Sequence, residues 1–223
     1  GNNFPNWLVN NAGWWSATIL TDSEFNFDPS YTKESLYPCI ELSTDVACFE
    51  RTINSHGFRG SEITVGKQSE VFRIFIVGGS TVNGAASDND KTWPAYLENV
   101  ANENIVGKKV EVINAGISGA TSKSEVNLVE QKIIGYDPDL IVMYDGWNDY
   151  SVHTVSEITE NWKSFCKLGN KEGFGTIVVV QPLAGTGYRV PTDQEMQYAG
   201  TVSTYLNKSQ QLVNEFETLN KIC

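Results

Sequence analysis

Three short glycine-rich stretches hold the residues of this 223-residue chain that could carry out chemistry. The first contains Ser80, in the string Gly-Gly-Ser-Thr, directly after an apolar run. A serine in a tight turn between a strand and a helix exposes its hydroxyl, and the N–H groups at the helix start can hold an oxyanion. The second stretch, residues 114–122, could supply another backbone N–H, and the third offers the side-chain amide of Asn148. Together the three stretches offer one hydroxyl and several N–H donors that could hold a developing negative charge.

Taken singly, each stretch also fits an ordinary turn, because Gly, Asn, Asp and Ser dominate turns. A glycine-rich turn after a strand could also hold phosphate. However, the Gly-Lys-Ser/Thr of a P-loop and the G-x-G-x-x-G of dinucleotide-binding folds are both absent. The occurrence of three such stretches after three successive apolar runs favours one shared site.

The elements that would position these residues alternate along the chain. Apolar runs bounded by turn residues predict strands at 71–77, 110–113, 139–144 and 175–180. Amphipathic stretches predict helices at 92–105, 122–134, 156–168 and 192–222. This alternation predicts an α/β domain over 71–223, with a parallel sheet covered by helices on both faces. Such sheets bind ligands at the carboxyl ends of their strands, so Ser80, Gly119 and Asn148 are expected to converge there.

The three stretches together resemble the SGNH, or GDSL-like, serine hydrolases. In that family the serine after the first strand is the nucleophile. Its own N–H, a glycine of the second loop and the asparagine of a G-x-N-D motif form the oxyanion hole. The matching residues are Ser80, Gly119 in Ser-Gly-Ala, and Asn148 in Gly-Trp-Asn-Asp. Residues 54–60, Asn-Ser-His-Gly-Phe-Arg-Gly, also look like a segment that precedes the first strand in envelope-associated members.

The resemblance implies a three-layer, flavodoxin-like α/β fold and ester hydrolysis by acyl transfer through Ser80. It implies no metal and no cofactor. The expected substrate is a small-molecule or glycan ester: an acetylated surface glycan, a lipid or a small ester would fit, and family analogy leans towards an acylated carbohydrate.

The family's general base is missing from the sequence. The usual Gly-Asp-Ser-Leu is Gly-Gly-Ser-Thr here, which resembles one branch of the family. The family also carries an Asp-x-x-His motif near its C-terminus, and this chain has none; its two histidines are His56 and His153. His153 follows Asn148 closely enough to be considered as the base. The resemblance favours a domain that is incomplete at its C-terminus, with the base supplied by residues after Cys223, so we expect the chain to hydrolyse esters poorly.

Residues 1–70 form an irregular N-terminal segment rich in Trp, Asn, Ser and Thr. The string at 4–15, which ends in Asn-Asn-Ala-Gly-Trp-Trp, resembles short Trp-rich modules of secreted archaeal proteins. Its aromatic side chains could stack on carbohydrate or on a partner, and a cluster that docks the segment onto the domain is the favoured alternative. The segment supports an extracellular setting.

Four cysteines without a C-x-x-C pair fit two disulfides in an oxidising compartment, and four reduced thiols in the cytosol are the alternative. We predict the disulfides Cys39–Cys48 and Cys166–Cys223. The first would close a short loop in the N-terminal segment, and the second would join the ends of two helices. These features together predict an extracellular or cell-surface protein.

The charge balance limits the class of partner. Acidic residues outnumber basic ones by 27 to 16, which gives a net charge of −11. Nucleic-acid binding needs a basic face, so no nucleic-acid partner is expected. The rival to an enzyme is a non-catalytic surface module of the same fold that binds glycan or a partner protein, and the missing base favours that reading.

Overall fold

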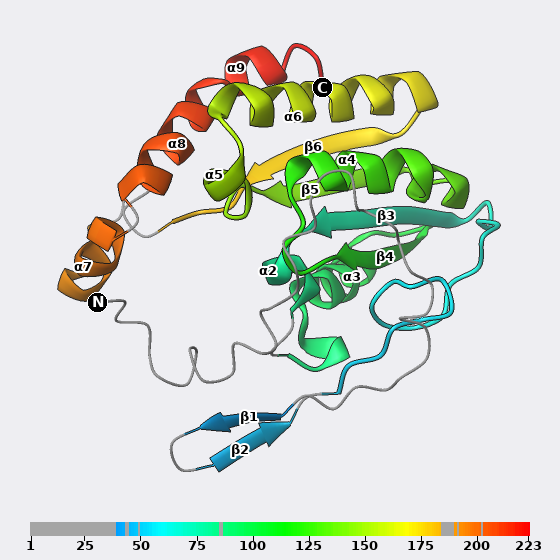
Figure 1. Ribbon diagram of the computed structural model, residues 1–223. Helices are drawn as coiled ribbons and strands as arrows, with labels where there is room; N and C mark the ends of the chain where they lie inside the picture. The colour runs from blue at the N-terminus through cyan, green and yellow to red at the C-terminus, as the bar shows by residue number, and fades with distance from the viewer. Residues whose placement is uncertain are drawn as a thin grey trace.

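The computed structural model describes residues 39–42, 45–48, 50–84, 87–183, 190, 192–201 and 203–223. Its centre is a sheet of four parallel strands in the order β4-β3-β5-β6 (Figure 1). The strands are β3 (Val71–Gly78), β4 (Lys109–Gly116), β5 (Leu140–Asp145) and β6 (Gly175–Val180). All four coincide with the predicted apolar runs to within a few residues. The sheet and its helices confirm the predicted α/β fold class.

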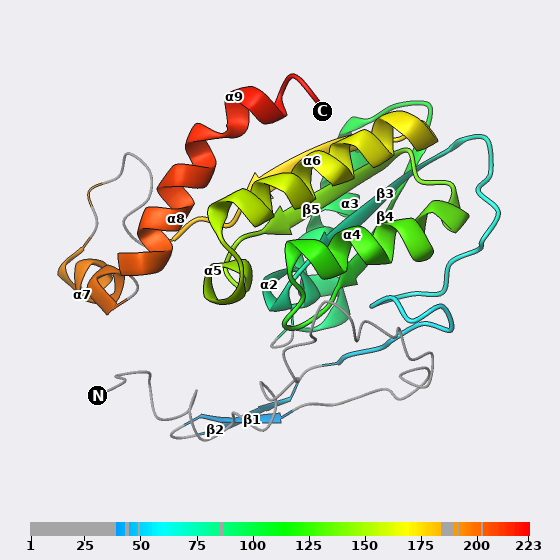
Figure 2. The same ribbon diagram turned by 45° about the horizontal axis from the view of Figure 1, so that its top comes forward.

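Helices cover both faces of the sheet (Figure 2). Helices α4 (Ser122–Gln131) and α6 (Val155–Glu172) pack side by side on one face. On the other face, α3 (Trp93–Asn104) packs against β4, and the short α2 (Ser80–Asn83) follows β3. The three-layer arrangement predicted from the sequence is therefore present.

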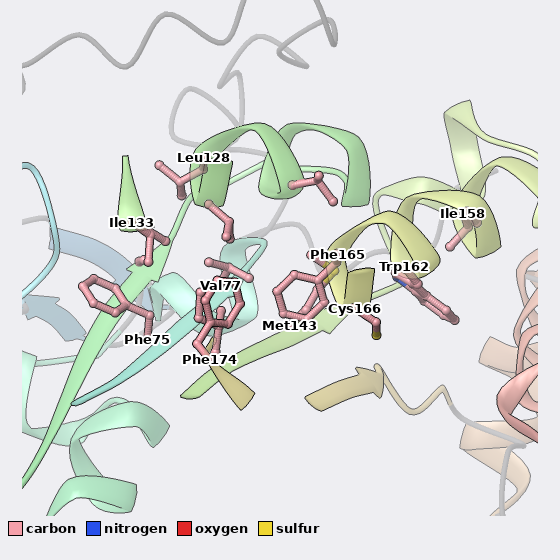
Figure 3. Close-up of a cluster of buried hydrophobic side chains, with 14 of the residues drawn as sticks. Phe75, Val77, Leu128, Ile133, Met143, Ile158, Trp162, Phe165, Cys166 and Phe174 are labelled. Atoms are coloured by element: carbon pink, nitrogen blue, oxygen red, sulfur yellow. The ribbon is translucent and has the colours of Figure 1, made fainter. Parts of the chain in front are cut away.

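The larger part of the core lies between the sheet and the α4–α6 layer (Figure 3). Phe75, Val77 and Met143 point from the strands into this layer and are completely buried. They meet Leu128 of α4 and Phe165 of α6, which are also buried. Burying an apolar side chain of this size stabilises a fold by ~1.5–3 kcal/mol, so this layer holds the strand ends in place.

Threonines set the starts of the three longer crossover helices. Thr92, Thr121 and Thr154 are the N-caps of α3, α4 and α6, and each hydroxyl accepts a hydrogen bond from a backbone N–H of the first turn. Such a cap satisfies one of the free N–H groups at a helix start and contributes ~1 kcal/mol. The predicted helix at 122–134 is corrected at its other end: α4 stops at Gln131, and a 3₁₀ turn, η4 (Ile133–Tyr136), leads into β5.

The single helix predicted over 192–222 is wrong. The structure has α7 (Asp193–Thr201), α8 (Ser203–Asn214) and α9 (Phe216–Leu219) in this region. Helix α8 ends in a tight turn in which Glu215 N donates to the Leu212 carbonyl. The bend allows Phe216 to stack on Trp162 of α6, with ring centroids 6.1 Å apart. Packing on α6 therefore overrides the helical period of the sequence.

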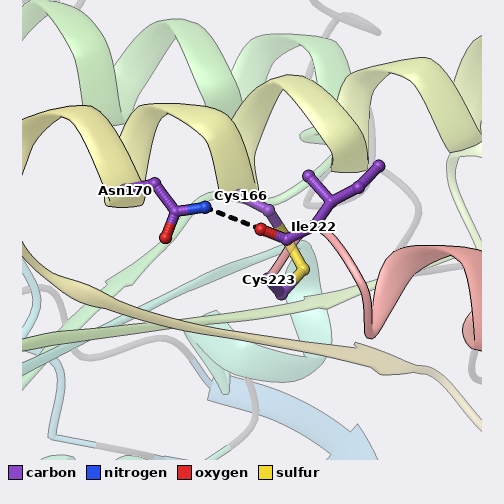
Figure 4. The surroundings of a disulfide bond; sticks show 4 residues. All are labelled: Cys166, Asn170, Ile222 and Cys223. Atoms are coloured by element: carbon purple, nitrogen blue, oxygen red, sulfur yellow. Dashed lines mark hydrogen bonds between the residues drawn. A yellow bond between two sulfur atoms is a disulfide. The ribbon is translucent and has the colours of Figure 1, made fainter.

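A disulfide joins the end of the chain to α6, as predicted. Cys166 lies within α6 and is completely buried, and it is bonded to Cys223, the last residue (Figure 4). Beside the bond, Asn170 Nδ2 donates a hydrogen bond of 2.6 Å to the Ile222 carbonyl. The crosslink ties the residues after α9 to α6.

The N-terminal segment contains one described element before residue 50. Strands β1 (Cys39–Leu42) and β2 (Asp45–Cys48) form an antiparallel hairpin in which Cys39 is paired opposite Cys48. The Cys39–Cys48 disulfide and the Trp-rich string at 4–15 lie outside the described side chains and stay predictions. Among the helices that the structure describes, none has the length and apolar character needed to span a membrane.

Candidate active site

Ser80 lies at the carboxyl end of β3, where the strand turns into α2. Its side chain is half-buried. Gly79 N-caps α2, and the carbonyl of Gly79 accepts hydrogen bonds from the N–H groups of Val82 and Asn83. Within the described residues, neither the N–H nor the hydroxyl of Ser80 has a hydrogen-bond partner. The turn thus presents a hydroxyl and a backbone N–H side by side.

Gly119 lies in the loop that follows β4. Ile117 N donates to the Gly78 carbonyl over 2.9 Å, which ties this loop to the end of β3. Gly119 has a φ of +84°, and no atom lies within 4 Å of the place where a Cβ would stand. Its N–H has no acceptor in the described part of the chain. Glycine is favoured here because the turn needs a left-handed backbone conformation.

Asn148 follows β5 and is the N-cap residue of α5 (Asp149–Val152). Its Nδ2 donates a hydrogen bond of 2.7 Å to the Ala120 carbonyl, which fixes the orientation of the amide. The same Nδ2 lies 2.5 Å from the place where a Cβ on Gly79 would stand. Residue 79 must therefore be glycine for Asn148 to approach the turn that carries Ser80.

These contacts bring the three predicted site residues to one edge of the sheet. Asn148 lies against the residue before Ser80 and bonds to the residue after Gly119. The Ser80 N–H, the Gly119 N–H and the Asn148 amide therefore belong to adjoining turns at this edge. Donors arranged in this way can hold a negatively charged oxygen as it forms on a carbonyl carbon that the hydroxyl attacks. The catalytic roles of the three residues stay predictions.

Two asparagines join α2 to β4 beneath this turn. Asn83 Nδ2 donates to the Gly116 carbonyl over 2.8 Å, and Asn114 Nδ2 donates to the Val82 carbonyl over 2.9 Å. Both side chains are buried. They satisfy backbone carbonyls that the short helix and the strand end would otherwise leave unpaired.

Arg59 is a supporting residue that sequence reasoning missed. Its guanidinium is buried and donates to the carbonyls of Asn83, Gly84 and Ser87, so it closes the C-terminal end of α2. Burial, followed by the charge of Arg51, lowers the pKa of Arg59 to about 10, against the opposing effect of Asp88. Arg59 therefore remains charged at neutral pH. It belongs to the Asn-Ser-His-Gly-Phe-Arg-Gly segment, which was the only sequence signal for it.

Neither histidine forms a described hydrogen bond with Ser80. His56 Nδ1 pairs with the Tyr136 hydroxyl at 3.0 Å, and Tyr136 precedes β5, at the opposite end of the strand from Asn148. His153 is buried, and its Nδ1 lies 2.8 Å from Asp149 Oδ1. His153 is thus held within a buried polar network behind the site.

Two further carboxyl groups, those of Glu125 and Asp145, are buried close enough to Asp149 for their pKa values to depend on its charge. Burial, and then the charge of Asp149, raises the pKa of Glu125 well above its usual value. Burial raises the pKa of Asp145 as well, helped by the charges of Glu125 and Asp149. Burial acts in the same direction on Asp149, but hydrogen bonds from His153, Asp145 and Ser122 outweigh it and leave the pKa below its usual value. Asp149 is therefore the ionised member. In the described part of the chain, no group of three or more His, Cys, Asp or Glu side chains has the arrangement of a metal site.

The raised pKa of Glu125 predicts how stability depends on pH. Between the unfolded-state pKa of about 4.3 and the raised folded-state value, the folded protein keeps a proton that the unfolded chain has lost. The free energy of unfolding should therefore fall as pH rises, by up to ~1.4 kcal/mol per pH unit for this one group. Urea unfolding at about pH 5 and about pH 8 should show this loss in the wild type and a smaller loss in Glu125→Gln.

The matched control is Glu130→Gln, on the same helix but exposed. It should keep the pH dependence of the wild type. If the free energy of unfolding changes over this pH range by the same amount in the wild type and in Glu125→Gln, Glu125 does not hold its proton in the fold.

The rim of the site carries polar and aromatic side chains from later elements. Gln181, directly after β6, donates from Nε2 to the Thr81 hydroxyl over 3.0 Å. Trp147 is half-buried and contacts Tyr205 of α8 edge-on, with ring centroids 5.3 Å apart. The chain after β6 therefore contributes to the surroundings of Ser80 and Asn148.

Comparison with known proteins gives one family match. Residues 76–216 match the sequence model of the GDSL-like Lipase/Acylhydrolase family. No curated protein sequence matches the chain significantly. Several solved structures are similar to it at low identity. One is a mutant of an acetyl-xylooligosaccharide esterase from Geobacillus stearmophilus, with 19% identity over 65% of this chain and 72% of that one, and a TM-score of 0.46.

Two further structures lie in the same range. A GDSL-like lipase from Bacteroides thetaiotaomicron has 17% identity, covers 71% of this chain and 69% of its own, and gives a TM-score of 0.47. The psychrotrophic esterase EstA from Pseudoalteromonas has 17% identity, with coverages of 64% and 72% and a TM-score of 0.45. The family assignment rests on the sequence match, which spans more than half of the chain and includes Ser80, Gly119 and Asn148. This chain belongs to the GDSL-like lipase/acylhydrolase family.

Proposed function

We propose that this protein is a secreted or cell-surface serine ester hydrolase that acts by acyl transfer through Ser80. The observation that carries the proposal is the meeting of Ser80, Gly119 and Asn148 at one edge of the sheet, with Asn148 pressed against Gly79. Family membership supports an ester as the substrate.

In the proposed reaction, the Ser80 oxygen forms a bond to the carbonyl carbon of the ester. The carbonyl electron pair moves onto its oxygen, which the N–H groups of Ser80, Gly119 and Asn148 then hold. Return of this pair expels the alcohol and leaves an acyl-enzyme, which water hydrolyses in the same way. The hydroxyl proton of Ser80 must pass to a base and then to the leaving alcohol. Since no described residue accepts a hydrogen bond from Ser80, we expect slow turnover from the chain as given.

The rim supports an acylated carbohydrate as the substrate. Half-buried Trp147 directly precedes Asn148, and an aromatic ring at this position could stack on a sugar ring. Thr81 and Gln181 offer a hydroxyl and an amide to sugar hydroxyls. The acetyl-xylooligosaccharide esterase among the similar structures acts on a substrate of this class.

The disulfide supports the proposed location. Disulfides persist in secreted and surface proteins and are rare in the cytosol. The Cys166–Cys223 bond therefore favours an oxidising compartment. The alternative function is a non-catalytic surface module that binds glycan or a partner protein, and it is favoured by the Ser80 hydroxyl having no hydrogen-bond partner among the described residues.

Labelling with a fluorophosphonate probe distinguishes the two functions. An esterase should be labelled at Ser80, as located by peptide mass spectrometry, and Ser80→Ala should lose both the label and the turnover of a short p-nitrophenyl ester above background. Ser69→Ala, an exposed serine before β3, is the control and should behave as the wild type. A folded chain that takes up no label at Ser80 would instead support the non-catalytic module.

A further inference from the structure

The carboxylate of Asp149 connects the two loops that carry the proposed oxyanion donors. Asp149 is completely buried at the start of α5. Its Oδ2 accepts a hydrogen bond of 2.9 Å from Ser122 N, and its Oδ1 accepts one of 2.5 Å from Ser122 Oγ. The same Oδ1 lies 2.8 Å from His153 Nδ1. One side chain therefore binds the start of α4 and the end of α5.

These contacts join the loop that carries Gly119 to the turn that carries Asn148. Ser122 is the first residue of α4 and comes three residues after Gly119, while Asp149 directly follows Asn148. Asn148 also holds the Ala120 carbonyl through its Nδ2. The side chains of two consecutive residues, 148 and 149, thus form hydrogen bonds to the end of the Gly119 loop at two points. These hydrogen bonds fix the position of the Gly119 N–H relative to the Asn148 amide.

The charge of Asp149 suits this task. Hydrogen bonds to the carboxylate keep its pKa below the usual value despite burial, so it is ionised at neutral pH. Charge-assisted hydrogen bonds are about twice as strong as neutral ones, and a negative charge at the first turn of α4 is also stabilised by the helix. Asn161 Nδ2 donates to Ser122 Oγ over 2.9 Å, which orients that hydroxyl towards Asp149.

We propose that Asp149 is a positioning residue for the acyl transfer. It holds the Gly119 N–H and the Asn148 amide in place so that both can donate hydrogen bonds to the same oxyanion. This inference rests on the proposed function. His153 acts through Asp149 by fixing the orientation of its carboxylate. His153 thus supports Asp149 and does not act as the base.

The test compares Asp149→Asn with Ser122→Ala and with the control Asp139→Asn. Asp139 is a hydrogen-bonded carboxylate at the opposite end of β5, bound to Arg73 N and Lys67. Two quantities are measured on the full chain: turnover of p-nitrophenyl acetate above the Ser80→Ala background, and amide hydrogen exchange of residues 117–121. Misplaced donors should lower kcat by ~10²-fold in Asp149→Asn and leave KM within about threefold. Exchange in 117–121 should rise about tenfold while the amides of β3 and β5 keep their protection.

Ser122→Ala, which loses only the hydroxyl bond, should show smaller changes in the same direction. It also keeps the test open if Asp149→Asn does not fold. Unchanged exchange in 117–121, or an equal rise throughout the sheet, would overturn the positioning role and leave Asp149 as a stability residue only. If Ser80→Ala retains the full turnover of the wild type, the proposed function fails, and the exchange data alone then decide whether Asp149 holds the loop.

Discussion

Asn148→Ala should lower the Ser80-dependent kcat by ~10²–10³-fold, because it removes one of three proposed oxyanion donors. The amide lies against Gly79 and is oriented by the Ala120 carbonyl, so it is fixed before a substrate arrives. A donor that acts on charge formed in the transition state contributes little to substrate binding, so KM should change little. The measurement is steady-state hydrolysis of a short p-nitrophenyl ester, corrected for the Ser80→Ala background.

Two further variants separate loss of the donor from loss of structure. Asn148→Asp keeps the size of the side chain but replaces the donor with a negative charge, so it should be at least as damaging as alanine. Gly79→Ala keeps the Asn148 side chain, but the new Cβ would lie 2.5 Å from Asn148 Nδ2 and must displace the amide. Wild-type kcat in Asn148→Ala would show that this amide does not stabilise the transition state.

Removal of the Cys166–Cys223 disulfide should have the largest effect on stability. The two cysteines are 57 residues apart in the sequence, and a crosslink closing a loop of that length restricts the unfolded chain by ~4 kcal/mol. The double variant Cys166→Ala/Cys223→Ser should therefore unfold roughly 10 °C below the wild type. Differential scanning calorimetry without reductant measures the shift.

The double variant leaves Cys39 and Cys48 unchanged, so its effect belongs to the C-terminal crosslink alone. Chemical reduction of the wild type would act on any other disulfide as well, and the difference between the two treatments tests the predicted Cys39–Cys48 bond. A double variant as stable as the wild type would mean that the packing of Phe216 and Leu219 on α6 holds the C-terminal helices without the crosslink.

The sequence alone determined the four strands of the sheet and the starts of α3, α4 and α6 to within a residue or two. Strands β3 and β5 are apolar runs that end in glycine or aspartate. A parallel strand that is covered on both faces reads as a continuous apolar run, and such a run is easy to recognise in a sequence. Threonines before α3, α4 and α6 mark helix starts because their hydroxyls satisfy free N–H groups within the same turn. These are local effects, so they can be recognised in a linear sequence.

The places of Ser80, Gly119 and Asn148 could also be predicted, because parallel strands bring their carboxyl ends to one edge. The sequence could not show that Asn148 lies against Gly79 or that Asp149 holds Ser122, since these partners come from different strand–helix units. Arg59 reaches the carbonyls of Asn83 and Ser87 in the same way, across more than twenty residues.

Tertiary packing also decided the C-terminal region. Residues 192–222 have a helical period, yet the chain turns at Glu215 because Phe216 and Cys223 have partners on α6. The buried carboxyls of Glu125, Asp145 and Asp149 likewise look like unrelated polar positions in the sequence. Their proton states depend on one another through the low-dielectric interior, and only the folded chain brings them together.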